Sequence, residues 1–423
     1  MAVSTHATPR PRHSAKDLSR RTARKLLLAG FSVVLFIVSG IGFAYHDLQS
    51  QVNTIDIDDL IGDDRPDKVA DDYEGQAVNI LILGTDSRAG DNNVDGAEGT
   101  EEVAVARSDT TMILHLSADR SRMEVVSIPR DTLVEIPECT TADGGTVGPM
   151  SDTQFNAAFA NGAGSGNDDA AIAAGVACTI KTVEELTDLY IDEYVVVDFN
   201  GLTTMVDALG GVTLYVDEDI DDPEYTGLTL NSGCQHLDGA TALQYARVRH
   251  GVGDGSDLGR IPRQQNLVSA MIRTAKSKNY FTDADALYSF ARSALGTLTT
   301  SPGIGSLTTL AGLAQSVGDI GMDQITFITM PNEEAPWDRD RVIPTDEASD
   351  VWAAIKADTP VSEALTDTAS QEATDSSGAD STDQAQEDES TEPDAGTDQS
   401  DTASDEHTPT ANATTEDPAA QCY

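Results

Sequence analysis

The chain has 423 residues and a formal net charge of −46, with 26 Lys and Arg residues against 72 Asp and Glu residues. This length allows one large domain or two ordinary ones, each able to bury a hydrophobic core. The acidity argues against nucleic acid as a partner, because no basic face is available to displace the counterions of its phosphates. Any anionic ligand must therefore be bound by a local group of basic side chains.

The N-terminal part of the sequence has the pattern of a membrane anchor. A basic segment, 1–25, precedes an uncharged apolar run, 26–45, which has the length of a membrane span. The basic flank should stay in the cytoplasm, so everything after His46 is expected outside the cell. A cleaved signal sequence is the alternative, although no good A-x-A-like site follows the run, and it would also export the rest. The acidic residues 46–75 are then expected to form an extracellular linker.

The first predicted strands follow this linker. An apolar run at 78–83 predicts a buried strand that ends at Gly84, and two further strands are expected at 110–117 and 122–129. The polar, glycine-rich residues 89–106 between the first two strands should form a surface loop.

Helices and strands alternate along the next part of the chain. Apolar residues at helical spacing and a closing glycine predict helices, and apolar β-branched runs predict strands. The expected helices are 168–187, 200–211, one beginning near 238, and 263–277, and the expected strands are 193–199 and 212–216. Such alternation implies an α/β fold, an α-β-α sandwich around a central mixed sheet.

The C-terminal residues 360–423 are predicted to be a disordered acidic tail. No Lys or Arg follows Lys356, and Ser, Thr, Ala, Gly, Asp and Glu dominate, so the segment cannot bury enough apolar surface to fold. The four cysteines show no C-x-x-C spacing and suit two disulfides in an exported domain. Three pairings are possible; Cys139–Cys178 with Cys234–Cys422 is the preferred one.

Acidic and arginine side chains occur together near the ends of three predicted strands. These groups are Asp86 with Arg88, Arg107 with Asp109, and Arg130 with Asp131. A fourth group lies in the stretch YARVRHGVGDGSDLGRIPRQQN, which contains Arg247, Arg249, Asp257, Arg260 and Arg263. Ligands of open α/β sheets bind in crevices at strand ends, so these groups are expected to converge.

The convergent groups match the chemistry of a pyrophosphate bound with a metal ion. Mg²⁺, or Mn²⁺, takes one or two carboxylates together with phosphate oxygens, and Asp86 with Asp109 would supply them. Arginine forks bind phosphate oxygens bidentately and stay charged at any relevant pH. In an extended segment Arg247 and Arg249 would point to the same face. Pairing with surface acids accounts for any single arginine equally well, but accounts for the whole group poorly.

The two histidines nearest these motifs are not expected to be catalytic. His115 lies in an apolar strand, which favours a packed core residue over a base. His250 has arginine neighbours that disfavour its protonation. No Ser–His–Asp order, Walker loop or zinc signature stands out in the sequence.

A series of motifs resembles the LytR-CpsA-Psr family of bacterial envelope proteins. They are NILILGTDSR, RSDTTMILHL, SIPRDTLV, FNAAFA, TVEELTDLYIDEYVVVDFNGLTTMVDALGGV, LDGATALQYARVRH and DLGRIPRQQNLV. Agreement in order and spacing runs from about residue 76 to about 278, and more loosely to about 344. The resemblance implies a catalytic domain at 76–345.

The resemblance also implies an activity. It implies a phosphotransferase that moves a glycopolymer from a polyprenyl-pyrophosphate carrier to a peptidoglycan sugar hydroxyl and leaves polyprenyl phosphate. Asp86 and Asp109 would hold Mg²⁺, and Asp257 would act as a base or orient an arginine. Pyrophosphate binding would fall to Arg88, Arg107, Arg130, Arg247, Arg249, Arg260, Arg263 and Gln264, of which Arg130, Arg247, Arg249 and Arg260 would also act in catalysis. The polyprenyl chain would occupy an apolar pocket, with Val196, Leu202, Met205 and Leu209 as possible contacts.

Two departures from the family pattern leave the acceptor open. The segment between Asp86 and Asp109 is longer than usual, and one residue is added between Arg249 and Asp257. The acceptor is therefore peptidoglycan or, alternatively, a cell-wall protein, or water in a polyprenyl-pyrophosphate hydrolase. A non-enzymatic envelope regulator is the third interpretation, but the short cytoplasmic segment contains no DNA-binding domain.

Overall fold

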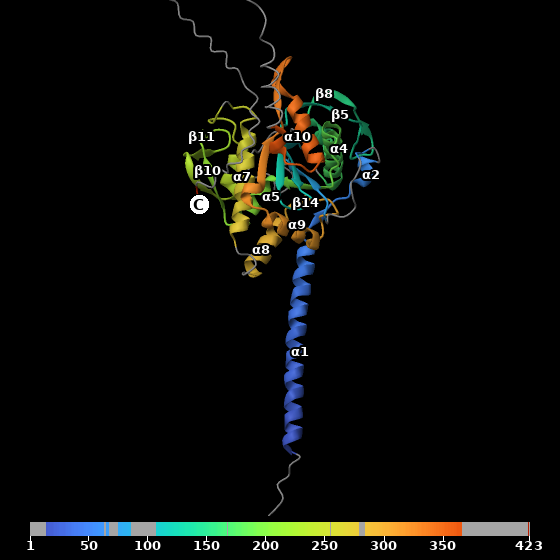
Figure 1. The fold of residues 1–423 in the computed structure, drawn as a ribbon, viewed down its shortest axis with the longest axis vertical. Coiled ribbons are helices and arrows are strands. Elements are labelled where there is room, and N and C mark those ends of the chain that lie inside the picture. Colours follow the sequence, from blue (N-terminus) through green and yellow to red (C-terminus); the bar gives the residue numbers. More distant parts are fainter. Residues whose placement is uncertain are drawn as a thin grey trace, which may run out of the picture. The chain divides into compact units, whose positions relative to one another are not determined.

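The computed structural model describes residues 14–62, 65–66, 75–85, 107–166, 168–253, 255–278, 284–365 and 422 (Figure 1). Asp86, Arg88, the expected loop at 89–106 and nearly all of the acidic tail lie outside these ranges. The chain divides into two compact units, Met1–Gln51 and Val52–Tyr423.

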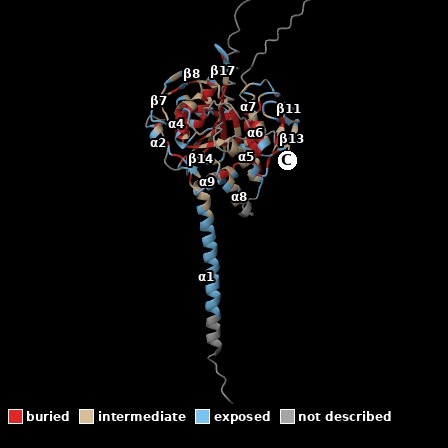
Figure 2. Ribbon diagram, turned by 180° about the vertical axis from the view of Figure 1, so that it is seen from behind, coloured by how far each residue is buried: buried red, intermediate tan, exposed pale blue. Residues whose placement is uncertain are grey.

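The first unit contains one long helix, α1 (Ser14–Gln49). Its part Thr22–Gln49 has a mean hydropathy of 2.5 and is long and apolar enough to cross a membrane. The side chains described along the helix are mostly exposed, as the pale blue ribbon of Figure 2 shows. An exposed helix that is apolar on all sides is suited to lipid rather than to water.

The second unit is built on a seven-stranded mixed sheet, as predicted. In spatial order its strands are β1 (Asn53–Thr54), β14 (Leu298–Thr300), β9 (Glu193–Asp198), β2 (Val78–Thr85), β3 (Ser108–Leu116), β4 (Met123–Ile128) and β15 (Ile325–Thr329). The three central pairings β2–β9, β2–β3 and β3–β4 are parallel, antiparallel and antiparallel, respectively.

Helices cover both faces of this sheet, which confirms the α-β-α sandwich. Alternate side chains of β2 point to opposite faces, so Leu81 and Leu83 join one core and Val78 and Ile80 another. The first core is closed by α2 (Asp58–Ile61), α3 (Ala157–Ala163), α4 (Asp169–Thr187) and α10 (Asp346–Lys356). The second is closed by α7 (Arg260–Ser277) and α9 (Leu307–Asp319), and Figure 1 shows α4 and α7 on opposite sides of the strands.

A third core lies beside α7. It contains Val206, Leu214 and Leu267, which come from different elements. These elements are α5 (Phe199–Ala208), α6 (Gly239–Arg247), and the hairpins β10 (Val212–Val216) with β13 (Gly233–Leu237) and β11 (Ile220–Asp222) with β12 (Leu228–Leu230). The remaining elements are β5 (Leu133–Ile136) paired with β8 (Met150–Gln154), β6 (Cys139–Thr140) paired with β7 (Thr146–Val147), β16 (Asn332–Ala335) paired with β17 (Asp338–Pro344), α8 (Ala284–Leu295) and a short 3₁₀ helix, Met322–Gln324.

Three local predictions were wrong. Gly84 does not end β2; a Cβ there would lie 2.9 Å from the Cβ of Thr110, so glycine allows close approach of β3. Arg247 is the last residue of a helix, not part of an extended segment, and Val248, which follows it, is extended. The helix expected from Arg263 begins one turn earlier, at Arg260.

The expected linker contributes to the fold. Ile55, Ile57 and Ile61 are buried in the first core, and β1 extends the sheet beside β14. Later in the same expected linker, Arg65 donates to the Glu184 carboxylate at 2.6 Å. The acidic stretch around β1 contains too few apolar residues to show the alternation of a strand, so the sequence did not predict this edge strand.

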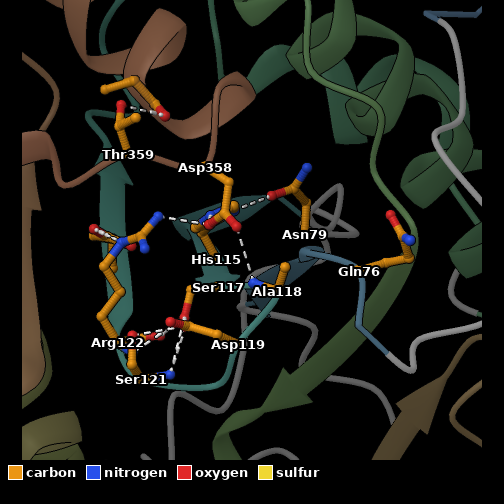
Figure 3. A network of polar contacts seen from close by, with 12 residues as sticks. Gln76, Asn79, His115, Ser117, Ala118, Asp119, Ser121, Arg122, Asp358 and Thr359 are labelled. Atoms are coloured by element: carbon orange, nitrogen blue, oxygen red, sulfur yellow. Dashed lines mark hydrogen bonds and ion pairs between the residues drawn. The ribbon is translucent and has the colours of Figure 1, made fainter.

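The C-terminal boundary also lies later than residue 345. Asp358, beyond α10, accepts hydrogen bonds from Arg122 Nη2 at 2.5 Å and from the amide of Ala118 at 3.0 Å (Figure 3). His115 is 1% exposed, as expected for a core residue, with Nδ1 2.7 Å from Asn79 Oδ1 and Nε2 3.2 Å from Asp358 Oδ1. We call Asn79, His115, Arg122, Glu124 and Asp358 the His115 network.

Both disulfides of the preferred pairing are present. Cys139 on β6 is bonded to Cys178 on α4, which ties the small hairpin to the helix layer. Cys234 on β13 is bonded to Cys422, across a sequence separation of 188 residues.

Candidate active site

The ends of four strands meet at one edge of the sheet. Thr85, the last residue of β2, pairs with Ser108 on β3 and with Asp198 on β9. Asp109 therefore lies at the start of β3 beside this edge, and Arg130 follows the end of β4 by two residues. The strand-end groups are brought together as the register of an open α/β sheet predicts.

The loop between α6 and α7 brings the arginine-rich stretch to the same edge. Buried Val248 and Val252 anchor it in the third core. Gly251 has φ of +67°, and a Cβ there would lie 1.9 Å from the carbonyl oxygen of Asp221, so only glycine fits. Arg263 Nη2 donates to the carbonyl of Val248 at 2.8 Å and joins the two ends of the loop.

The carboxylate of Asp257 is the centre of the cluster. Its Oδ1 lies 2.7 Å from Arg260 Nη2, 3.1 Å from Arg130 Nε and 3.4 Å from Arg249 Nη2. The Asp257 side chain is only 10% exposed, and the three guanidinium groups come from the β4 end, the α6–α7 loop and the start of α7. One carboxylate therefore fixes three separate segments around one point.

Asp109 completes the cluster. Its Oδ1 lies 2.7 Å from Arg130 Nη1, and its backbone carbonyl accepts from Arg260 Nη2 at 2.7 Å. We call Asp109, Arg130, Arg249, Asp257 and Arg260 the arginine cluster. All five were predicted as site residues.

Burial and mutual charge set the ionisation of the cluster. Burial raises the pKa of Asp257, and the charges of Arg260, Arg130 and Arg249 oppose that rise. Burial lowers the pKa of Arg260 to about 10, which still leaves it charged at neutral pH. Burial also acts to lower the pKa of Arg130, but the neighbouring carboxylates outweigh it and the pKa is raised.

A cavity of about 460 Å³ opens beside the cluster, between the sheet and the helices α5, α6 and α7. Its polar end is formed by Asp109, Arg247, Arg249 and Arg260. Its remaining wall is largely apolar, with Ile82, Met112 and Val197 from the sheet and Leu202, Met205, Leu243, Leu267, Val268, Met271 and Ile272 from the helices. The site is therefore suited to a ligand with an anionic head and a long apolar part.

Only part of the expected lipid-contacting set lines this cavity. Leu202 and Met205 do so. Val196 instead points to the opposite face of the sheet and packs in the first core, because its neighbour Val197 faces the cavity. Leu209 is buried in the third core.

Of the other predicted site residues, some line the cavity and others do not. Arg247 is on the cavity wall, with its guanidinium carbon 4.5 Å from the centre of the Phe199 ring. Gln264 also lines the cavity and donates to the carbonyl of Ala246 at 3.3 Å. Arg263 joins the loop ends, and Arg107 is exposed just before β3. Asp86 and Arg88 lie outside the described residues.

Some neighbours of the cluster were not selected as site residues, although the sequence analysis had grouped Asp131 with Arg130. Asp131 accepts from Gln154 Nε2 at 2.6 Å and lies 3.4 Å from Arg130 and 3.7 Å from Arg341. Its place beside Arg130 in the IPRDT motif was a usable signal, but nothing in the sequence singled out Gln154 or Arg341. Asp198 and Phe199 line the cavity, and their place at the end of an apolar strand was also a signal.

Asp109 fits a divalent cation as one ligand of a pair. It presents a carboxylate at the wall of a cavity whose other polar groups suit phosphate, and hard cations prefer such oxygen ligands. Within the described residues no group of three or more His, Cys, Asp or Glu side chains could hold a metal, and phosphate and water oxygens would supply further ligands to an ion bound at Asp109. Asp198 is engaged in capping α5, where its Oδ1 accepts from the amide of Gly201 at 2.7 Å.

Comparison with known proteins identifies related chains. The model of the LytR_cpsA_psr family matches residues 44–357. The probable cell wall biosynthesis protein LcpB of Corynebacterium glutamicum is 35% identical over 228 residues, which are 53% of this chain and 49% of LcpB. The chain therefore matches about half the length of that relative.

A second relative is matched over more of its length. The polyisoprenyl-teichoic acid–peptidoglycan teichoic acid transferase TagU of Halalkalibacterium halodurans is 33% identical over 265 residues, 62% of this chain and 74% of TagU. Among solved structures, Bacillus subtilis TagV superposes with a TM-score of 0.50 at 27% identity and covers 68% of this chain and 100% of TagV.

Proposed function

Because the chain belongs to the LytR-CpsA-Psr family, we propose that it transfers a glycopolymer from a polyprenyl-pyrophosphate carrier to a hydroxyl of peptidoglycan. The observation that carries the proposal is the arginine cluster at the polar end of an apolar cavity. A polyprenyl pyrophosphate has the same two parts, an anionic head and a hydrocarbon chain. The name of TagU, a teichoic acid transferase, supports the reaction class.

The donor would bind with its pyrophosphate at Arg247, Arg249 and Arg260 and its hydrocarbon chain along the apolar wall. Guanidinium forks match phosphate oxygens in geometry as well as in charge. The apolar wall excludes water around the phosphates, so each charge interaction gains strength. The acidic surface elsewhere would confine anion binding to this point.

The reaction needs charge neutralisation and in-line positioning more than covalent help from the protein. The acceptor hydroxyl oxygen forms a bond to the phosphorus that carries the glycan, and the bond from that phosphorus to the bridging oxygen breaks. The electron pair leaves with polyprenyl phosphate, and the hydroxyl proton passes to that phosphate or to solvent. The fixed arginines offset the charge that develops on the leaving oxygen.

Asp257 acts in this scheme by positioning arginines. Its carboxylate is nearly buried, contacts three guanidinium groups and is not part of the cavity wall. Arg130 contacts both carboxylates, that of Asp109 on the cavity wall and that of Asp257 behind it. We propose this positioning role for Asp257 rather than that of a general base, which would have to reach the acceptor proton.

A bound Mg²⁺ or Mn²⁺, held by Asp109 and Asp86, would neutralise phosphate charge and polarise the phosphorus. We further propose that α1 anchors the protein in the cell membrane with its N-terminus in the cytoplasm and the catalytic domain outside. This topology would give the domain access to a membrane-borne donor and to the wall.

The test is turnover of a synthetic polyprenyl-pyrophosphate oligosaccharide by the full-length chain in lipid nanodiscs. Mass spectrometry would measure polyprenyl monophosphate and the glycan phosphodiester, with and without peptidoglycan fragments and with and without EDTA. Arg249→Ala should abolish product, whereas Arg339→Ala, a matched arginine that is 92% exposed on β17, should not.

The arms of the assay separate the acceptors. Monophosphate release that requires peptidoglycan supports the proposal, and release without any acceptor indicates hydrolysis. Transfer to an added cell-wall protein alone indicates a protein acceptor. Equal activity of Arg249→Ala and the parent would contradict the pyrophosphate site, and tight donor binding without turnover in any arm would support a non-enzymatic role.

A further inference from the structure

An exposed aromatic pair lies next to the arginine cluster. Among the described residues of the second unit, the large apolar side chains that are exposed are Tyr225, Leu258 and Trp337. Tyr225 is 71% exposed, and its ring centre lies 4.0 Å from that of His250 at an interplanar angle of 36°. His250 directly follows Arg249, which lines the cavity. Single exposed apolar residues are common, but a stacked pair beside a site is a candidate contact for a ligand.

The pair is held in place by the backbone on both sides. Tyr225 lies in the turn between β11 and β12, whose Ile220 and Leu228 are buried in the third core. The amide of Asp221 donates to the carbonyl of Gly251 at 3.2 Å, so the hairpin is fastened to the loop that carries Arg249. The glycine at 251 is required for this close approach. The exposed ring is thus presented by an ordered support rather than by a loose loop.

Charge restricts the ligands that this surface can accept. Asp221 and Glu224, which precede Tyr225 in the chain, are exposed, whereas the nearest Lys or Arg residues along the chain, Arg247 and Arg249, line the cavity. Carboxylates accept hydrogen bonds but repel phosphates and anionic lipid headgroups. A neutral ligand rich in hydroxyl groups and with an apolar face meets both conditions, and a pyranose ring is such a ligand.

We propose that Tyr225 and His250 form a platform that binds a neutral pyranose ring of the glycan next to the pyrophosphate. The C–H face of the sugar would stack on the exposed face of the Tyr225 ring, and its hydroxyl groups would donate to nearby carboxylates. His250 directly follows Arg249, and the hairpin that carries Tyr225 is bonded to the same loop, so a sugar attached to a phosphate at Arg249 would be within reach of the platform. The inference rests on the proposed function and adds to it a site for the sugar.

The first experiment measures sugar binding without turnover. Saturation-transfer difference NMR would follow N,N′-diacetylchitobiose with the full-length chain in nanodiscs. Tyr225→Ala should remove the transfer signal, Tyr225→Phe should keep it because the ring remains, and Trp337→Ala, a 64% exposed aromatic on another hairpin, should leave it unchanged. Equal signals from the parent and Tyr225→Ala would overturn the platform.

The second experiment identifies the source of the sugar. With the glycan-bearing donor, Tyr225→Ala should raise KM about 3- to 10-fold, the usual range for one aromatic contact, with Tyr225→Phe near the parent. Binding of sugar-free polyprenyl pyrophosphate should not change. If only the KM for peptidoglycan fragments rises, the platform binds the acceptor sugar instead. Unchanged values for both substrates would refute the inference.

The two experiments also separate this inference from the proposed function. Sugar contact at Tyr225 in a protein that shows no turnover would support the platform and reject the transferase. Normal turnover with no loss on Tyr225→Ala would reject the platform and leave the transferase standing.

Discussion

The arginine cluster and the His115 network lie at opposite ends of the same two strands. Asp109 is near the start of β3 and His115 near its end, while Arg122 precedes β4 and Arg130 follows it. Both groups bury charged side chains in ion pairs of 2.5–3.4 Å. Only the arginine cluster borders the large cavity, and the His115 network is closed by Asp358 and by backbone amides.

The difference shows how buried charge is used in each place. In the His115 network, Asp358 and Glu124 face Arg122, and the remaining Asp358 oxygen accepts from a backbone amide. At the cavity, three arginines line the wall with Asp109 and Asp198, and Asp198 is engaged as a helix cap. Carboxylates held by an arginine and by backbone amides stabilise the fold, and excess positive charge beside a cavity is available to a ligand.

The largest expected effect comes from an arginine-to-lysine substitution, made once in the arginine cluster and once in the His115 network. Arg260→Lys keeps the charge but loses the planar fork, so we expect turnover to fall about 100-fold with little change in stability. Arg122→Lys should leave turnover within about twofold and lower the free energy of unfolding by about 1–2 kcal/mol, because Arg122 bridges Glu124 and Asp358. Kinetics and urea unfolding of both variants check this; loss of activity in both would remove the distinction.

Asp358→Asn should weaken the ion pairs of the His115 network and so lower the stability of the fold. Asn tolerates the positive φ of 53° at this position, so the change removes charge without backbone strain. The loss of charge-assisted bonds from Arg122 should cost about 1–3 kcal/mol of unfolding free energy, with kcat unchanged. Calorimetry with a parallel turnover assay measures both. If kcat falls under conditions in which the variant is fully folded, the His115 network and the arginine cluster are coupled.

In the arginine cluster, Asp257→Asn should have a smaller effect on turnover than Arg260→Lys. Without the central negative charge the three guanidinium groups lose their common partner, and we expect kcat to fall about 10-fold. Affinity for inorganic pyrophosphate should not fall, because the cluster becomes more positive. Titration calorimetry and kinetics separate the two quantities, and a loss of pyrophosphate affinity in step with kcat would argue against a positioning role.

The smallest expected effect is a pH dependence that belongs to the His115 network. Burial lowers the pKa of His115 below its ordinary value of 6.5, although Asp358 acts to raise it and Arg122 and Arg120 to lower it. The unfolded state then binds the proton more readily, so stability should fall as pH decreases below about 6.5, by at most about 1.4 kcal/mol per pH unit.

Urea unfolding between pH 5 and 7 tests this dependence. His115→Gln should remove that part of the slope, and Arg249→Ala should retain it. Rising stability at low pH would instead show that Asn79 and Asp358, which both present acceptor oxygens, hold the ring protonated.

Much of the sheet was predictable because its strands are buried on both faces. The continuous apolar runs of β2 and β9 are typical of strands covered by helices on both sides, and β10 occurs at the predicted residues. Edge elements were less readable: β1 has two residues and lies in an acidic stretch. The turn at Asp358 follows a helix that lies far along the chain from its partners, which lie on β3 and in the turn between β3 and β4, so no local sequence pattern predicts these contacts.

For the site, residue types at strand ends were sufficient to select the arginine cluster. Motifs identified Asp109, Arg130 and Arg260 because guanidinium groups are scarce in so acidic a chain. The contacts of Asp257 could not be read in the same way, since they depend on how the α6–α7 loop folds against β4. The cavity wall was half predicted, because one residue of register decides whether Val196 or Val197 faces it.

The bond between Cys234 and Cys422 has a topological consequence. It makes residues 234–422 a covalent ring that includes α7, the end of the sheet and the whole acidic segment. A protease that cuts once within 366–421 opens the ring but sheds no fragment, because both pieces stay attached. Reducing conditions are needed before such a cut separates the two pieces. Limited proteolysis followed by gels with and without reductant would therefore show that both ends of the cut segment remain joined to the rest of the chain until the disulfide is reduced.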